Sequence, residues 1–253
     1  MALLEVAGVG VRFGGIQALG GVDLAVPGGG VTGLIGPNGA GKTTLFNVVC
    51  GLQRAHSGRV LLDGRDISSL PPHRRARLGI ARTFQRLEIF SSLSVRENIL
   101  VAAEIRRRFS RDGSNPRKVA DEVIELTGLG PVAREQADTL PTGLARLVEV
   151  ARALASKPSV LLLDEPSSGL DETETSDLGG LLGRLASDGM SVLLVEHDMD
   201  MVMALSRTIY VLDFGRVLAK GSPDEIRSDP AVRAAYLGAE DNPGTTEAAS
   251  AIA

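Results

Sequence analysis

Short apolar runs separated by turns fill the first 35 residues of the chain, and this pattern predicts strands. Gly/Pro segments such as Pro27–Gly30 mark the turns between them. The predicted strands are Leu3–Val6, Val9–Phe13, Ala18–Val26 and Val31–Ile35. A further strand, Val60–Leu62, is expected to end in the turn Asp63-Gly64.

The pattern changes to helical spacing from about residue 95 to residue 157. The predicted helices there are Val95–Phe109, Arg117–Thr127 and Gly143–Ser156. Strands and helices then alternate, which favours an α/β fold. The runs Val160–Leu163 and Val192–Val195 are typical of central parallel strands. The remaining predicted elements are a helix over Glu174–Leu185, a hairpin of Ile209–Leu212 with Arg216–Ala219, and short helices over Pro223–Ser228 and Pro230–Leu237.

Composition narrows the picture further. The 253 residues, 43% of them hydrophobic, suffice for one large domain or a domain with a subdomain. The net charge of −4 gives no overall basic field, so we expect no nucleic-acid partner. The single cysteine, Cys50, cannot form an internal disulfide, which fits a reducing cytoplasm. No apolar run approaches a membrane span, and Met1–Glu5 does not resemble a signal peptide.

A phosphate-binding motif joins the strand Val31–Ile35 to the apolar segment that follows. It matches G-x-x-x-x-G-K-[ST] at every fixed position and reads Gly36-Pro37-Asn38-Gly39-Ala40-Gly41-Lys42-Thr43-Thr44. In a strand–loop–helix setting, backbone N–H groups and the helix N-terminus converge on one anion. We therefore expect Lys42 to reach the β- and γ-phosphates of ATP and the Thr43 hydroxyl to ligate Mg²⁺.

Two carboxylates end the apolar strand Val160–Leu163. In nucleotide hydrolases such a strand lies beside the phosphate loop, so Asp164 is expected to hold Mg²⁺ and Glu165 to act as general base. His197 follows the next predicted strand. Taken alone, it fits either a surface histidine or a group that reaches the γ-phosphate.

Together these motifs resemble those of ABC-transporter ATPases. The phosphate loop, Gln85, the strand with Asp164 and Glu165, the segment Ser168–Asp171 and His197 occur in the family's order, and the resemblance covers nearly all of residues 3–238. Within the family, the chain resembles the branched-chain amino acid importer branch. That likeness is carried by Gly79–Gln85, Glu97–Ala102, the long stretch Glu104–Lys118 and the ending Ala235-Tyr236-Leu237-Gly238.

The resemblance implies a fold and several residue roles. The fold is a P-loop nucleotide-hydrolase core with a mixed, mainly parallel sheet, an N-terminal antiparallel β subdomain and a helical signature subdomain over about 90–157. We expect residues 1–238 to form one domain, and the small, polar composition of 239–253 predicts a disordered tail. Gln85 is similar to the glutamine that contacts Mg²⁺ and opens a groove for the permease. Phe13 resembles the aromatic that stacks on adenine, although its periodicity equally fits a strand core. Asp171 resembles the residue that crosses to the partner subunit, and His197 the switch residue.

The signature segment departs from the family's Leu-Ser-Gly-Gly-Gln. This chain has Leu140-Pro141-Thr142-Gly143-Leu144. Pro141 offers neither the hydroxyl nor an N–H that would bind the partner's γ-phosphate. The Thr142 hydroxyl, the Gly143 N–H and the helix N-terminal field remain. We expect ATP to close a homodimer weakly unless a second, different ATPase subunit supplies a fuller signature.

The resulting hypothesis is an ATP- and Mg²⁺-dependent motor subunit on the cytoplasmic face of the membrane. Its expected partners are permease subunits, a second ATPase subunit and, indirectly, a solute-binding protein, with branched-chain or related amino acids as cargo. Three alternatives remain. They are a lipopolysaccharide-export ATPase, a soluble ABC ATPase acting on DNA or ribosomes, and a phosphate-loop kinase. The basic residues around Arg106–Arg108 fit a solvated helix face better than a nucleic-acid site.

Overall fold

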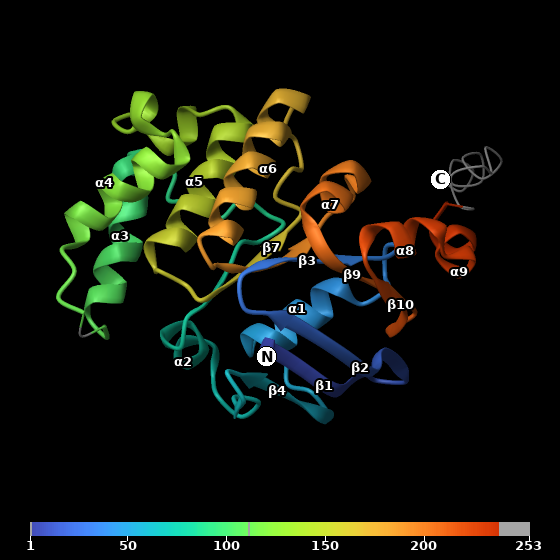
Figure 1. Cartoon of the computed structure of the whole chain (residues 1–253). Coiled ribbons are helices and arrows are strands. Elements are labelled where there is room, and N and C mark those ends of the chain that lie inside the picture. The colour runs from blue at the N-terminus through green and yellow to red at the C-terminus, as the bar shows by residue number, and fades with distance from the viewer. Residues whose placement is uncertain (1, 111, 238–253) are drawn as a thin grey trace, which may run out of the picture.

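Two sheets organise the molecule in the computed structural model, which describes residues 2–110 and 112–237 (Figure 1). The smaller sheet is antiparallel, in the order β2-β1-β4-β5. Its strands are β1 (Ala2–Phe13), β2 (Ile16–Pro27), β4 (Ser57–Leu62) and β5 (Arg65–Asp66). The structure merges the two predicted strands Leu3–Val6 and Val9–Phe13 into β1, because shifts of register around Gly8 keep both halves paired with β2.

The larger sheet has the order β10-β9-β3-β8-β7-β6. All neighbouring pairs are parallel except the edge pair of β9 and β10. Its strands are β3 (Gly30–Ile35), β6 (Ile80–Arg82), β7 (Val160–Asp164), β8 (Ser191–Val195), β9 (Ser206–Asp213) and β10 (Arg216–Gly221). These sheets confirm the predicted α/β class, with a mixed, mainly parallel sheet and an antiparallel sheet.

Side chains of β7 show how one strand serves two cores. Val160 and Leu162 join the core that contains α1 (Lys42–Cys50) and the antiparallel sheet. Leu161 and Leu163 join the core under the helices on the opposite face. Successive side chains of a strand point to opposite faces, so a fully apolar run is what a strand covered on both sides requires.

Helices cover the second face of the large sheet and extend beyond its edge (Figure 1). Ser94 begins α3 with a capping box, and Asn115 begins α4 by accepting the Arg117 N–H. The helices of this layer are α3 (Val95–Arg107), α4 (Pro116–Thr127), α5 (Thr142–Ala155) and α6 (Glu172–Ser187). Shorter helices are α2 (Pro72–Arg77), α7 (Met199–Leu205), α8 (Pro223–Ser228) and α9 (Pro230–Val232).

The strands β5 and β6 and the helices α2 and α7 were absent from the sequence-based prediction. The strand β6 has only three residues. The helix α2 buries only Arg75 and so has no apolar stripe, and α7 is apolar at all but one position, so neither shows helical periodicity. The predicted helix Pro230–Leu237 is α9 followed by one π turn, Arg233–Leu237. The predicted disordered tail lies outside the described residues. Within the described residues, no helix combines the length and apolarity that a bilayer crossing needs.

Candidate functional site

The carboxyl ends of four adjacent parallel strands form the site. The phosphate loop, residues 36–44, follows β3, and Gln85 follows β6. Asp164 ends β7, Glu165 comes directly after it, and His197 follows β8. Because parallel strands end at the same edge, residues distant in sequence meet there.

Glu165 is the centre of this meeting point. Its Oε2 accepts a hydrogen bond from Gln85 Nε2 at 3.1 Å, and its Oε1 lies 2.7 Å from His197 Nε2. The Glu165 backbone has a φ of 51°, in the left-handed region that non-glycine residues rarely adopt. Its N–H bonds to Val195 O at 2.8 Å, which holds this conformation. A residue held in such a sparsely populated conformation is typical of a functional position.

The phosphate loop wraps a cavity of about 230 Å³, lined by Ala18, Asn38–Thr44, Gln85 and Glu165. Lys42 Nζ donates to Gly36 O at 2.5 Å and to Pro37 O at 3.1 Å. Burial lowers the pKa of Lys42, while the charges of Glu165 and Asp164 oppose that shift. The cavity therefore combines a buried amine, the N-terminus of α1 and a carboxylate, which suits a phosphate chain with a water beside it.

Asp164 is held by a residue that sequence reasoning did not single out. Its Oδ2 accepts from Arg82 Nη2 at 2.8 Å, and both side chains are nearly inaccessible to solvent. Arg82 also donates to Asn47 Oδ1 at 2.6 Å, and its guanidinium carbon lies 5.3 Å and 4.9 Å from the centres of the Phe46 and Phe84 rings. A buried carboxylate needs such a partner. The position of Arg82, three residues before Gln85, was the available signal, but β6 is too short to be recognised.

Glu196 is a second residue that the sequence did not reveal. It is buried at the end of β8, where Oε1 accepts the Ser167 N–H at 2.7 Å and Oε2 accepts the His197 N–H at 3.1 Å. Burial raises the pKa of Glu196, and these backbone bonds oppose the shift. The side chain therefore ties the loop after β7 to the loop that carries His197.

The signature segment lies apart from the phosphate-loop cavity. Pro141 is the N-cap residue of α5, and Leu140 precedes it in an extended conformation. Thr142 and Gly143 form the first turn of α5, where the Glu174 carboxylate packs directly against the Gly143 backbone. Asp171 caps α6 by accepting the Glu174 N–H at 2.8 Å. Within the part of the chain that the structure describes, the signature segment and Asp171 do not line the phosphate-loop cavity.

Phe13 ends β1 with half of its surface exposed (50%), opposite Ile16 in the β1–β2 hairpin. It does not belong to a packed strand core, which was one of the two sequence-based readings.

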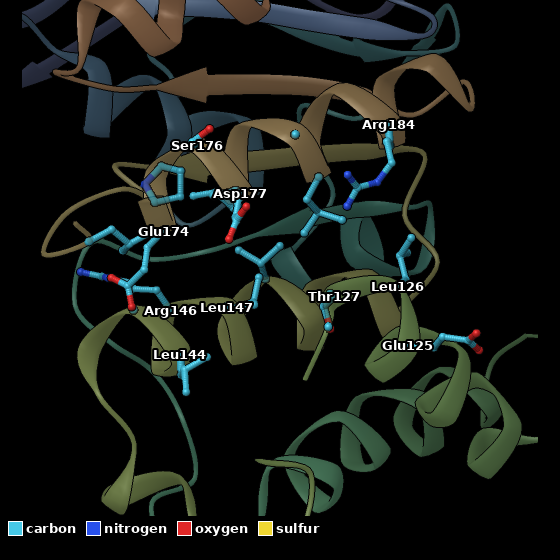
Figure 2. Close-up of a pocket in the computed structure, with 18 residues that line it drawn as sticks. Glu125, Leu126, Thr127, Leu144, Arg146, Leu147, Glu174, Ser176, Asp177 and Arg184 are labelled. Carbon is cyan, nitrogen blue, oxygen red and sulfur yellow. The ribbon is translucent and has the colours of Figure 1, made fainter. Parts of the chain in front are cut away.

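A larger cavity, about 490 Å³, lies between α5, α6 and the end of α4 (Figure 2). Leu144 and Arg146 of α5 and Glu174 of α6 line one end of it, and Arg184 lines it further along α6. Its lining lacks the phosphate loop and the strand-end carboxylates. Size alone therefore does not identify the site of chemistry in this molecule.

Comparison with known proteins agrees with this geometry. The ABC transporter family model matches residues 19–168, more than half of the chain. The chain belongs to the ABC transporter ATP-binding family. It is accordingly a nucleotide-binding ATPase subunit, and the fold expected from the family resemblance is confirmed. A model described as "Branched-chain amino acid ATP-binding cassette transporter" also matches residues 216–242.

Individual relatives cover almost the whole ATPase subunit. The high-affinity branched-chain amino acid transport ATP-binding protein BraF of Pseudomonas aeruginosa is 41% identical over 93% of this chain and 98% of its own length. The lipopolysaccharide export system ATP-binding protein LptB of Haemophilus influenzae is 36% identical, over 94% and 98%. The ADP conformation of MJ1267, an ATP-binding cassette of an ABC transporter, is 31% identical, with a TM-score of 0.84 over 94% and 99% of the two chains.

Proposed function

We propose that this ATPase subunit drives import of branched-chain or related amino acids. ATP hydrolysis is supported above all by one observation. Glu165 contacts both Gln85 and His197 beside the phosphate-loop cavity. The family match over residues 216–242 and the 41% identity to BraF support the cargo class. We treat residues 1–238 as one domain, with a helical subdomain inserted over about 90–157.

ATP is the proposed substrate of the phosphate-loop cavity. The backbone N–H groups of Gly36–Thr44 and the N-terminus of α1 would bind its phosphates. Lys42 would exchange its bonds to Gly36 O and Pro37 O for the β- and γ-phosphate oxygens. The exposed ring of Phe13 is the proposed contact for adenine.

The donor set beside the cavity fits Mg²⁺. The Thr43 hydroxyl, the Gln85 amide oxygen and the Asp164 carboxylate are the hard oxygen ligands that this cation prefers. When bound, the cation would neutralise charge on the β- and γ-phosphates. Arg82 binds Oδ2 of Asp164 and would hold this carboxylate in place.

Glu165 is the proposed general base. It would accept a proton from water while the water oxygen forms a bond to the γ-phosphorus and the bond to the β–γ bridging oxygen breaks, so that ADP leaves. When ATP binds, His197 would exchange its bond to Glu165 for one donated to the γ-phosphate, while Gln85 keeps hold of Glu165.

Transporter cassettes work as dimers with membrane permeases. We propose a head-to-tail pair here, in which ATP lies between the phosphate loop of one subunit and Leu140–Gly143 of the other, with Asp171 crossing the interface. The partner is a second copy or a different ATPase with a fuller signature. A groove of about 370 Å³ that includes Phe84 and Glu88 is the proposed contact for the permease. This arrangement puts the chain on the cytoplasmic face of the membrane, served indirectly by a solute-binding protein.

The first test uses a tagged Glu165→Gln chain, which keeps the shape of the side chain but lacks the base. Hydrolysis should fall about 10²- to 10⁴-fold, because that is the usual contribution of a general base. ATP binding should persist. Purification with ATP from detergent-solubilised source membranes should recover two permease chains and an amino-acid binding protein. Glu172→Gln, an exposed change at the start of α6, is the matched control.

The partners recovered decide between the remaining readings. Recovery of permeases together with lipopolysaccharide-assembly proteins would indicate export instead of import. The likeness to LptB keeps this alternative open. Recovery of ribosomes or DNA without permeases would overturn the transporter assignment. Normal turnover in Glu165→Gln would remove Glu165 from its proposed role.

A further inference from the structure

Two charged side chains of α5 bind the segment that carries Gln85. Arg146 Nη1 donates to Phe84 O at 3.0 Å and Nη2 donates to Gln85 O at 2.6 Å. One turn later on the same face of the helix, Glu149 Oε1 accepts the Phe84 N–H at 3.2 Å. The two side chains also contact each other, with Arg146 Nη1 at 3.3 Å from Glu149 Oε2.

Arg146 and Glu149 are shielded from solvent, which strengthens their hydrogen bonds. The side chains of Arg146 and Glu149 are only 11% and 6% exposed. Burial raises the pKa of Glu149, while the Phe84 N–H and Arg146 favour its charged form. Arg152, a further turn along α5, donates to Glu88 O and lies 4.6 Å from the centre of the Phe90 ring. Charge-assisted bonds in a shielded site are stronger than neutral ones on the surface.

Gln85 is held at both ends. Its backbone carbonyl is bound by Arg146, and its side chain donates to Glu165 at 3.1 Å. A forked guanidinium that binds two successive carbonyl oxygens fixes the direction of the chain between them. We infer that Arg146, oriented by Glu149, is a positioning residue that holds Gln85 within reach of Glu165. This inference rests on the proposed roles of Gln85 and Glu165.

The location of Arg146 on α5 connects the two nucleotide sites of the proposed dimer. It lies one turn after the signature residues Thr142 and Gly143 on the same helix. In the proposed dimer, those residues meet the partner's ATP, whereas Arg146 holds Gln85 in its own subunit's site. One rigid helix therefore links the two nucleotide sites.

A double-mutant cycle tests the inference in the full chain. Arg146→Met should lower ATP hydrolysis about tenfold or more, because a small misplacement of a group at the reacting atoms is costly. Arg146→Lys keeps the charge without the fork and should restore part of the rate. In a Gln85→Ala background, Arg146→Met should change the rate less than about twofold, because residues that act through one contact are not additive.

Hydrogen exchange supplies a readout that does not need turnover. The Phe84 amide, which donates to Glu149, should exchange about tenfold faster in Arg146→Met, while the amides of α1 stay unchanged. Arg117→Met, on an exposed position of α4, is the matched control and should alter neither readout.

These experiments distinguish a failure of the proposed role of Gln85 from a failure of the positioning role of Arg146. If Gln85→Ala hydrolyses ATP normally, the proposed role of Gln85 falls and the inference falls with it. If Gln85→Ala is slow and Arg146→Met slows it further by its full factor, only the positioning role is overturned. Unchanged exchange of the Phe84 amide in Arg146→Met would also overturn it.

Discussion

At the scale of single residues, Arg75 illustrates how a charged side chain completes a helix. It is almost fully buried (3% exposed), and Nη1 donates to Val48 O at 2.7 Å and to Val49 O at 2.8 Å in the last turn of α1. The other nitrogens donate to Leu70 O and Ser68 O. The last carbonyl groups of a helix lack their usual partner within it. Val48 O also accepts the Gly51 N–H, whereas Arg75 is the donor to Val49 O.

Replacement of Arg75 should therefore destabilise the fold. We expect Arg75→Met to lower the free energy of unfolding by about 3 kcal/mol or more, because several buried carbonyl groups lose their donor. Urea denaturation followed by circular dichroism measures the change. Arg74 lies at an exposed position of α2, the helix that also contains Arg75. The free energy of unfolding of Arg74→Met should stay within about 0.5 kcal/mol of the unmodified chain. Equal stability of the two variants would contradict this account.

At the scale of elements, the start of α5 combines good helix geometry with a poor anion site. Pro141 has a φ of −53°, which its ring adopts without strain, but its side chain caps nothing. A serine there would cap the helix, with a gain of about 1 kcal/mol. It would also lose a comparable amount through a more flexible unfolded chain. The two effects nearly cancel, so folding alone does not select between the residues.

A change at Pro141 should alter dimer formation rather than the stability of the fold. We expect Pro141→Ser to tighten ATP-driven dimerisation about tenfold or more, because a hydroxyl bond to a charged phosphate contributes about 1.5–3 kcal/mol. Analytical ultracentrifugation of Glu165→Gln chains with ATP provides the measurement. Pro141→Ala restores the N–H but not the hydroxyl and should tighten the dimer less than Pro141→Ser does. Equal tightening by serine and alanine would refute a role for the hydroxyl.

At the scale of the whole molecule, the site depends on the order of strands in the large sheet. The strands β3, β8, β7 and β6 are adjacent in space but distant in sequence. The core between the two sheets contains α1, so the phosphate loop is supported from both sides. Nucleotide bound at this edge should stabilise all of these strands together.

ATP should accordingly raise the melting temperature. At about a hundred times its dissociation constant, it would add about 2.7 kcal/mol. For a chain of this size, that corresponds to a rise of about 5–10 °C. Thermal unfolding of Glu165→Gln with Mg²⁺ measures the shift, which should shrink when EDTA removes the cation. Lys42→Met should show little shift, and an undiminished shift in that variant would place the ATP elsewhere.

Local patterns account for much of the fold. The sequence predicted β3, β7 and β8 from their apolar runs and α3–α5 from their helical spacing. Each of these patterns spans several repeats of its period. Neither β6 nor α2 was predicted, because β6 has only three residues and α2 has no apolar stripe. Arg82 and Arg146 were missed for another reason. Their partners, Asp164 and the backbone at residues 84–85, are more than sixty residues away along the chain.

The sequence by itself determined the phosphate loop, the strand-end acids and the family, because these depend on residues at fixed short spacings. Only the tertiary structure decided that Gln85 and His197 both contact Glu165, that Arg82 holds Asp164 and that α5 binds the segment around Gln85. The physical reason is that such contacts depend on the order of strands and on the packing of helices over them. No local periodicity encodes either.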